Sequence, residues 1–347
     1  GTGLIIPLVK DILSTRIQGT AGVLVQTNED ALKIAGLLTA SGMKARLIAS
    51  NDEFSLYNLH EIRYFISKLA TDEEQAIIRD ETWEGAKRAL KDKFRRSRFL
   101  AECECLLLDF EKTNPKLKYR SDFETYIRES KMEDFYQASG DTILVSTIHK
   151  AKGREFDQVF LMLKELNTAS GAALRLAYVA MTRARHALRI HAGRGFPAHL
   201  QAEGKQYHSD EATWPEPDAL LMHLGYKDVH LDYFIDRQSQ IARLISGDPL
   251  LVNRSGCFNN RGEQLLRFSQ SFLDRIAPLL EHYALQDASV YQIVYWQKNG
   301  SDREVCIVLP EVWLRRGGEA ICPLESVLTT DNKDVSTPEK KKQHYKP

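Results

Sequence analysis

The spacing of hydrophobic positions at the start of the chain predicts one β-α-β unit. Residues 22–26 form a short apolar run typical of a buried strand, and apolar positions at helical spacing follow from 31 to 38. A second apolar run at 45–49 completes the unit, which is typical of a parallel sheet. Asn28 is expected to cap the helix, because its side chain can accept a free backbone N–H, and Gly42 to end it.

The pattern changes between residues 51 and 140, where apolar positions follow a helical spacing without strand alternation. A long helix is expected at 86–108 and another at 122–132. The first of these contains the basic cluster Arg95, Arg96 and Arg98. This region is therefore predicted to be a helical insertion.

Strand and helix alternate again after residue 140. Strands are expected at 142–147, 158–163 and 187–191, with a helix at 172–185. The simplest assembly is one α/β domain with a parallel sheet, built from residues 1–50 and 141–193 and interrupted by the insertion at 51–140.

The last third of the chain has a mostly β pattern. Residues 194–220 contain several Gly and Pro and are expected to be a linker, and residues 221–325 to form a small β-rich, barrel-like accessory domain. Residues 326–347 are polar and Lys-rich and are expected to be disordered. Strands are expected at 229–234, 242–253, 264–268, 289–296 and 304–314, a helix at 271–284, and a hairpin turn at Asn299-Gly300.

Composition narrows the class of protein only a little. The 47 basic and 47 acidic side chains balance, so any contact with nucleic acid must come from local placement of charge. Five irregularly spaced cysteines match neither a zinc site nor a disulfide framework, so we expect no metal site and a reducing, cytoplasmic location. No apolar run approaches the ~20 residues that span a membrane, and no signal peptide is visible.

Residues 141–161, DTILVSTIHKAKGREFDQVFL, form the most informative segment. Thr147 and His149 are two residues apart at the carboxyl end of a predicted strand, where ligands gather in parallel sheets. Lys150 and Lys152 add positive charge, and Gly153 lets a ligand approach the backbone. These parts suit a phosphate grip. The alternative is an ordinary turn with a histidine satisfied in the core.

This segment and VAMTRA at residues 179–184 resemble motifs V and VI of the UvrD/Rep-type superfamily 1 DNA helicases. The resemblance implies a RecA-like fold for the α/β domain. It also implies that Thr147 and His149 lie on the single-stranded DNA track and that Gly153 and Glu155 face the nucleotide. Arg183 would reach the γ-phosphate across the cleft between two motor domains, as an arginine finger. For Arg183 the alternative is a solvated helix charge.

Two weaker resemblances extend the picture. In residues 23–28, VLVQTN, Asn28 matches a family residue that contacts the DNA backbone, and Gln26 replaces the usual arginine. Residues 54–62, FSLYNLHEI, resemble motif IVa at the entry to the insertion called 2B, so 51–140 would be a reduced 2B-type insertion. Its cluster Arg95, Arg96 and Arg98 could hold duplex DNA, although a solvated charged face is the alternative.

No GxxxxGK[ST] phosphate loop occurs in the 347 residues. We therefore predict the C-terminal segment of an ATP-dependent superfamily 1A helicase that moves 3′ to 5′, for example in DNA repair. The intact protein would use ATP and Mg²⁺ and bind single-stranded and duplex DNA. The missing N-terminal motor domain would be part of the same polypeptide, and this segment alone would not hydrolyse ATP. The alternative is a non-catalytic module built on a helicase remnant, whose β-rich domain holds nucleic acid or a protein partner.

Overall fold

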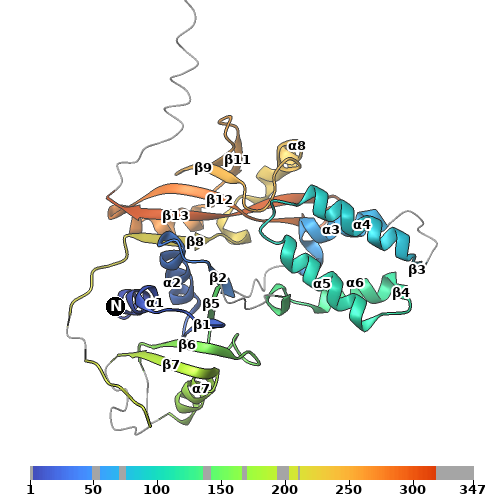
Figure 1. Cartoon of the computed structure of the whole chain (residues 1–347). Coiled ribbons are helices and arrows are strands. Elements are labelled where there is room, and N and C mark those ends of the chain that lie inside the picture. Colours follow the sequence, from blue (N-terminus) through green and yellow to red (C-terminus); the bar gives the residue numbers. More distant parts are fainter. Residues whose placement is uncertain are drawn as a thin grey trace, which may run out of the picture.

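A computed structural model describes residues 3–48, 55–69, 76–135, 142–165, 170–193, 203–209 and 212–317. Within these residues a five-stranded parallel sheet has the order β2-β5-β1-β6-β7, and a six-stranded curled antiparallel sheet has the order β11-β10-β9-β12-β13-β8. Figure 1 shows helices α3 to α6 gathered at one end of the molecule, away from the parallel sheet. The expected fold class, an α/β domain with a helical insertion and a β-rich C-terminal domain, is confirmed.

The parallel sheet separates two apolar layers. Alternate residues of its central strands face helices α1 and α2 on one side and helix α7 on the other. Strands β1 and β5 are buried along their whole length, as continuous apolar runs predict for a parallel sheet. The elements are α1 (Ile5–Ser14), β1 (Ala21–Val25), α2 (Asn28–Ala40), β2 (Ala45–Ile48), β5 (Ile143–Thr147), β6 (Phe156–Leu163), α7 (Gly171–Met181) and β7 (Ala184–Ala192).

The helical insertion differs from its prediction at one place that matters for function. The expected single helix at 86–108 is wrong, because α4 ends at Lys93 and α5 begins at Leu100. Phe94 and Phe99 are almost completely buried on either side of the turn, so tertiary packing breaks the helix without any Gly or Pro. The elements are η1 (Leu56–Asn58), α3 (His60–Leu69), β3 (Ile77–Ile78), α4 (Asp80–Lys93), α5 (Leu100–Thr113), β4 (Lys118–Tyr119), α6 (Arg120–Glu129) and η2 (Met132–Phe135).

The β-rich region is built on one long hairpin. Strands β12 and β13 pair over almost their whole length, and Gly300 at the turn has φ +79°, as the Asn-Gly signal predicts. The expected strand at 229–234 is wrong: these residues lie mostly in a 3-10 helix that buries Phe234. Only the end of the strand expected at 242–253 forms, and the helix expected at 271–284 ends at Ile276. The elements are β8 (Ala219–His223), η3 (Tyr226–Asp228), η4 (Leu231–Arg237), α8 (Gln238–Ile241), β9 (Pro249–Asn253), β10 (Gly256–Phe258), β11 (Gln264–Arg267), α9 (Gln270–Ile276), η5 (Leu279–Glu281), β12 (Tyr283–Gln297) and β13 (Glu304–Arg316).

Some expectations fall on other residues. The tail at 326–347 and part of the linker at 194–220 lie outside the described residues, as does Phe54 of the motif IVa resemblance. Among the helices that the structure does describe, none has the length and apolar character needed to cross a membrane.

Candidate functional site

The first group of predicted site residues lies where strands β1 and β5 end. The Ile148 amide donates to the Val25 carbonyl at 2.9 Å, which extends the ladder by one residue before the chain turns. Thr147 is 6% exposed, whereas His149 is exposed. The two side chains therefore do not share one environment, because the strand stops at Thr147 and His149 already belongs to the turn.

Asn28 and Lys150 meet at this edge of the sheet. The Lys150 ammonium donates to Asn28 Oδ1 at 3.0 Å and so joins the start of α2 to the turn after β5. The prediction that Asn28 caps α2 is wrong, because Thr27 occupies the cap position and its hydroxyl accepts from the Asp30 amide at 3.2 Å. Asn28 is instead the first helical residue, and its side chain is free for the contact with Lys150.

Gln26 binds backbone at the same edge. Its amide nitrogen donates to the Glu165 carbonyl at 3.0 Å, and its amide oxygen accepts from the Lys164 amide at 2.9 Å. Lys164 also pairs with the buried Asp30 at 2.5 Å. The residue that replaces the family's arginine therefore ties the end of β1 to the end of β6.

The second group lies at the opposite edge, where β6 and β7 begin. Arg183 directly precedes β7, and its Nε donates to the Val179 carbonyl at 2.9 Å while Nη1 donates to the Arg154 carbonyl at 3.3 Å. The Phe156 amide donates to the Arg183 carbonyl at 2.8 Å. The segments of motifs V and VI, far apart in sequence, therefore hold each other.

A salt bridge between Glu155 and Arg185 adds to this contact. Arg185 Nε lies 3.0 Å from Glu155 Oε2, and both side chains are more than half exposed. Gly153, two residues before Glu155, has φ +84°, a left-handed conformation that a side chain would strain. Nothing in the spacing of the residues signals that Arg185 pairs with Glu155.

Residues 148–155 connect the two edges by crossing one face of the sheet. Ile148 and Ala151 are completely buried on the face that α7 covers, and Lys152 is exposed. All strands of a parallel sheet end at one edge and begin at the other, and ligands gather at the edge where the strands end. Thr147 and His149 lie at that edge. Glu155 and Arg183 lie at the opposite edge, where the strands begin.

The basic cluster of the insertion splits as well. Arg95 and Arg96 are exposed, and Arg96 lies 3.6 Å from Asp248. Arg98 turns inward: its guanidinium lies 2.9 Å from Glu311 of β13 and over the Tyr291 ring of β12. The expectation that all three form one DNA-holding surface does not fit, because Arg98 joins the insertion to the β-rich domain.

Burial alone would raise the pKa of Glu311. A hydrogen bond from His223 and the positive charge of Arg98 outweigh burial and lower this pKa to about 2. Glu311 is therefore ionised at neutral pH and holds Arg98 and His223 together.

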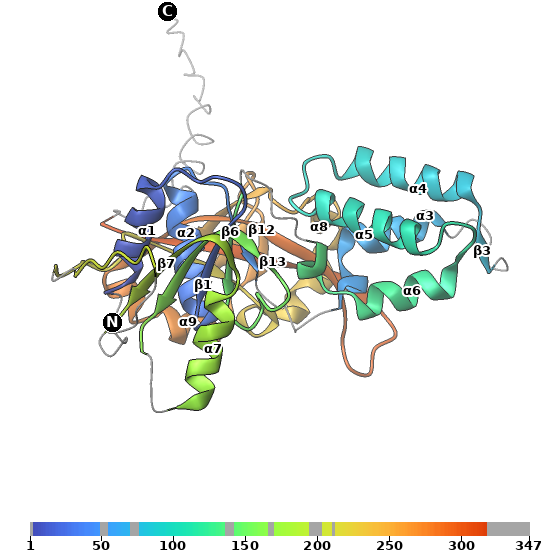
Figure 2. The same ribbon diagram turned by 60° about the horizontal axis from the view of Figure 1, so that its bottom comes forward.

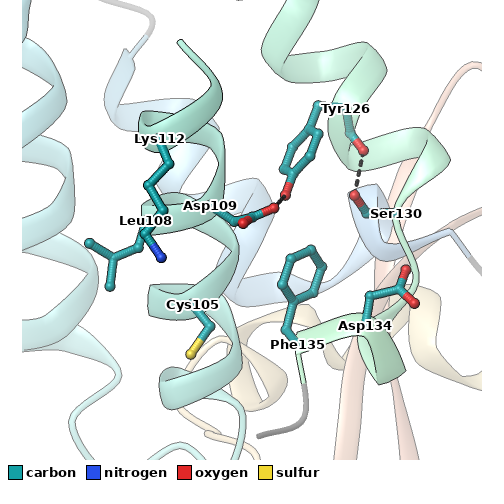
Figure 3. A pocket seen from close by; sticks show the side chains of 8 residues that line it. All are labelled: Cys105, Leu108, Asp109, Lys112, Tyr126, Ser130, Asp134 and Phe135. Atoms are coloured by element: carbon teal, nitrogen blue, oxygen red, sulfur yellow. Dashed lines mark hydrogen bonds between the residues drawn. The ribbon is translucent and has the colours of Figure 1, made fainter. Parts of the chain in front are cut away.

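A hollow of about 330 Å³ lies elsewhere on the insertion, between α5, α6 and η2. Figure 3 shows the Tyr126 hydroxyl donating to Asp109, at 2.7 Å, across one side of it. Its lining contains none of the predicted site residues: it consists of Cys105, Leu108, Asp109, Lys112, Tyr126, Ser130, Asp134 and Phe135. In the part of the chain that the structure describes, no three His, Cys, Asp or Glu side chains are grouped to hold a metal ion.

A parallel sheet with polar groups at both edges and a helical insertion define the class of a mixed α/β protein. Residues 67–194 match the family model of the UvrD-like helicase C-terminal domain. This match supports a UvrD-type helicase C-terminal domain in this part of the chain, as motifs V and VI predicted. The match covers most of the insertion and strands β5 to β7 and stops before the β-rich domain. The chain matched none of the curated proteins.

Proposed function

We propose that this chain supplies the second motor domain of an ATP-dependent superfamily 1A DNA helicase. The family match supports a helicase-related role and DNA binding. The observation that carries the finer proposal is the separation of the predicted residues into two groups at opposite edges of one sheet. One turn, residues 148–155, joins these edges, so DNA contact at one edge is mechanically linked to nucleotide contact at the other.

On the nucleotide side, Arg183 is the proposed arginine finger. A guanidinium keeps its charge and offers a planar fork to phosphate oxygens. The Val179 and Arg154 carbonyls fix its position, and Glu155 and Gly153 lie on the adjoining turn. Bound ATP and Mg²⁺ would come with the phosphate-loop domain of the intact protein. The described residues alone are proposed not to hydrolyse ATP.

On the DNA side, the proposed contacts are Thr147, His149, Lys150, Lys152 and Asn28. Cationic and short polar side chains at a sheet edge suit the phosphates of a single strand. Arg95 and Arg96 remain candidates for duplex DNA, because both are exposed. Arg98 is left out of the proposed DNA surface, because Glu311 holds it.

Fluorescence anisotropy of this chain with single-stranded and duplex oligonucleotides, over a salt series, tests the DNA side. We expect salt-sensitive binding to the single strand, weakened by His149→Ala and by Lys150→Ala. Each lost phosphate contact should reduce the salt slope by ~0.7 on a single strand. Arg261→Ala, which removes an exposed cation of the β-rich domain, is the matched control.

Binding that Arg261→Ala weakens and His149→Ala does not would assign the contact to the β-rich domain and favour the binding-module alternative. No salt-sensitive binding to either oligonucleotide would contradict the proposed DNA edge.

The nucleotide side is tested by joining this chain to a phosphate-loop motor domain in one polypeptide. Arg183→Ala should then lower ATP turnover by ~10³–10⁵ with little change in protein stability. Arg189→Ala is the control, because Arg189 pairs with Asp11 of α1. Equal turnover in the two variants would exclude Arg183 as the finger.

A further inference from the structure

The helical insertion and the β-rich domain share one buried core. A single cluster of buried side chains runs from α3 and α5 into strands β12 and β13. Leu59 forms a β-bridge with Val294, and the Phe99 and Tyr291 rings lie 5.8 Å apart at their centroids. In both views the β12–β13 hairpin reaches from beside the parallel sheet to the helical insertion (Figures 1 and 2). The two regions therefore pack as one body.

Buried polar groups reinforce this junction. Glu61 of α3 is 1% exposed and accepts hydrogen bonds from Ser97, at 2.6 Å, and from Ser246, at 3.0 Å. Ser97 belongs to the insertion and Ser246 to the β-rich domain. On the surface, Arg63 of α3 pairs with Glu304 of β13. Moving the insertion against the β-rich domain would take the Ser246 hydroxyl away from the buried Glu61 carboxylate.

The boundary with the α/β domain is built differently. The α/β domain has its own two clusters of buried side chains, separate from the shared one. Helix α2 packs against β8 where Gly36 lies close to Leu221. The polar contact at this boundary centres on Arg46 of β2, which pairs with the buried Glu102 and donates to the Arg98 carbonyl at 2.9 Å.

Arg46 lies on an outer strand of the parallel sheet, next to β5. Strand β2 pairs with β5, the strand that ends at Thr147. A movement at the edge of the sheet that carries the predicted DNA contacts would therefore reach Arg46 through one pair of neighbouring strands.

We propose that the insertion and the β-rich domain, residues 55–135 and 219–317, form one rigid composite unit, and that Arg46 fixes the orientation of this unit on the α/β domain. Domains that share a core do not rotate separately. At the boundary with the α/β domain, by contrast, helix α2 packs on β8 without a shared core, and the polar contacts centre on Arg46. The composite unit rests on contacts in this chain and is independent of the proposed helicase activity.

Hydrogen exchange followed by mass spectrometry tests whether the composite unit opens as one. Leu59→Ala removes a fully buried side chain from its core, and Ile34→Ala removes one from the α/β domain. Leu59→Ala should speed exchange in β12 and in α5 alike, on the order of a hundredfold, and leave β1 and β5 unchanged. Ile34→Ala should do the reverse. Faster exchange confined to α3–α6 after Leu59→Ala, or equal effects of both variants everywhere, would overturn the proposal.

Spin labels carried by non-cysteine chemistry test the role of Arg46. The exposed positions Ser41, Lys112 and Arg261 report on the α/β domain, the insertion and the β-rich domain. Arg46→Ala should broaden the distance distributions from Ser41 to both other labels and leave the distribution between Lys112 and Arg261 unchanged. Arg46→Lys should broaden the same distributions by less, because an ammonium keeps the positive charge but lacks the planar fork of a guanidinium.

Lys33→Ala is the matched control, since Lys33 pairs only locally with Glu29 on α2. A broadened distance between Lys112 and Arg261 would contradict the rigid unit. Three unchanged distributions after Arg46→Ala would show that Arg46 does not fix the orientation.

Discussion

The α/β domain and the composite unit use charged side chains in opposite ways. At the two edges of the parallel sheet, charged groups such as Lys150, Glu155 and Arg185 make short local contacts and stay largely at the surface. In the composite unit, the carboxylates of Glu61 and Glu102 are almost completely buried and connect separate regions. A run of charged residues in a sequence therefore does not by itself mark a binding surface, because its partners decide which way it points.

The sharpest test of this comparison separates two neighbours in the basic cluster. Arg98→Ala should lower the free energy of unfolding by about 3 kcal/mol, because it leaves the mostly buried carboxylate of Glu311 without its arginine partner. Arg95→Ala should change it by less than about 0.5 kcal/mol, as expected of an exposed side chain. Urea unfolding of both variants measures the difference. Equal effects would mean that Arg98 is no more structural than Arg95.

Two carboxylates of the composite unit should respond to pH with opposite sign. The pKa of Glu311 is lowered to about 2, so its contribution to stability is present above its ordinary pKa of 4.5 and is lost as the pH falls from 4.5 towards 2. Burial raises the pKa of Glu61, although hydrogen bonds from Ser97 and Ser246 oppose the rise. Its contribution is present below pH 4.5 and is lost as the pH rises through the folded-state pKa.

Replacing each carboxylate by an uncharged amide tests this opposite dependence of stability on pH. Glu311→Gln should destabilise the protein by about 2 kcal/mol at pH 7 and by much less near pH 2.5, just above the folded-state pKa. Glu61→Gln should be neutral or stabilising at pH 7, because an uncharged amide replaces a buried carboxylate. Unfolding free energies of both variants from pH 2.5 to 7 provide the check. Parallel pH profiles for the two variants would contradict the assignment.

Two helical glycines test the boundary between the α/β domain and the composite unit. A Cβ on Gly36 of α2 would lie 2.9 Å from the Leu221 Cβ, whereas a Cβ on Gly85 of α4 would meet no atom within 4 Å. Gly85→Ala should therefore stabilise the protein by about 0.5–1 kcal/mol through helix propensity. Gly36→Ala should destabilise it by about 1 kcal/mol, because the clash outweighs that gain. A stabilising effect of Gly36→Ala would show that α2 and β8 can move apart enough to accept the methyl group without loss of stability.

Much of the α/β domain could be predicted from its sequence. Apolar runs such as the one ending at Thr147 are short and continuous because both faces of a parallel sheet are covered, so the pattern itself reports the fold. The motif residues of the candidate site were likewise visible as a run. Their division between two edges was not, because it depends on a crossing of eight residues whose path is set by burial of Ile148 and Ala151.

The composite unit was harder to predict, because tertiary contacts override local preference there. The turn between α4 and α5 has no Gly or Pro, and it forms where Phe94 and Phe99 enter a core made partly by distant strands. Arg98 and Glu311 are more than two hundred residues apart, so neither residue type nor spacing reveals their pairing. Local sequence patterns predict helices and strands. Contacts with residues far away in the sequence decide where a helix ends and which way a charged side chain points.

The smallest effect concerns the start of α2, where one position separates a structural role from the proposed functional one. Thr27→Ala should lower the unfolding free energy by about 1 kcal/mol, because its hydroxyl accepts from the Asp30 amide. Asn28→Ala should change it by less than about 0.5 kcal/mol, since Asn28 makes only an exposed contact with Lys150. Asn28→Ala should instead weaken binding to single-stranded DNA. Thr27→Ser should leave this binding unchanged. Thermal unfolding and anisotropy on the same samples separate helix capping from DNA binding. A large loss of stability with Asn28→Ala would mean that Asn28, and not Thr27, caps α2.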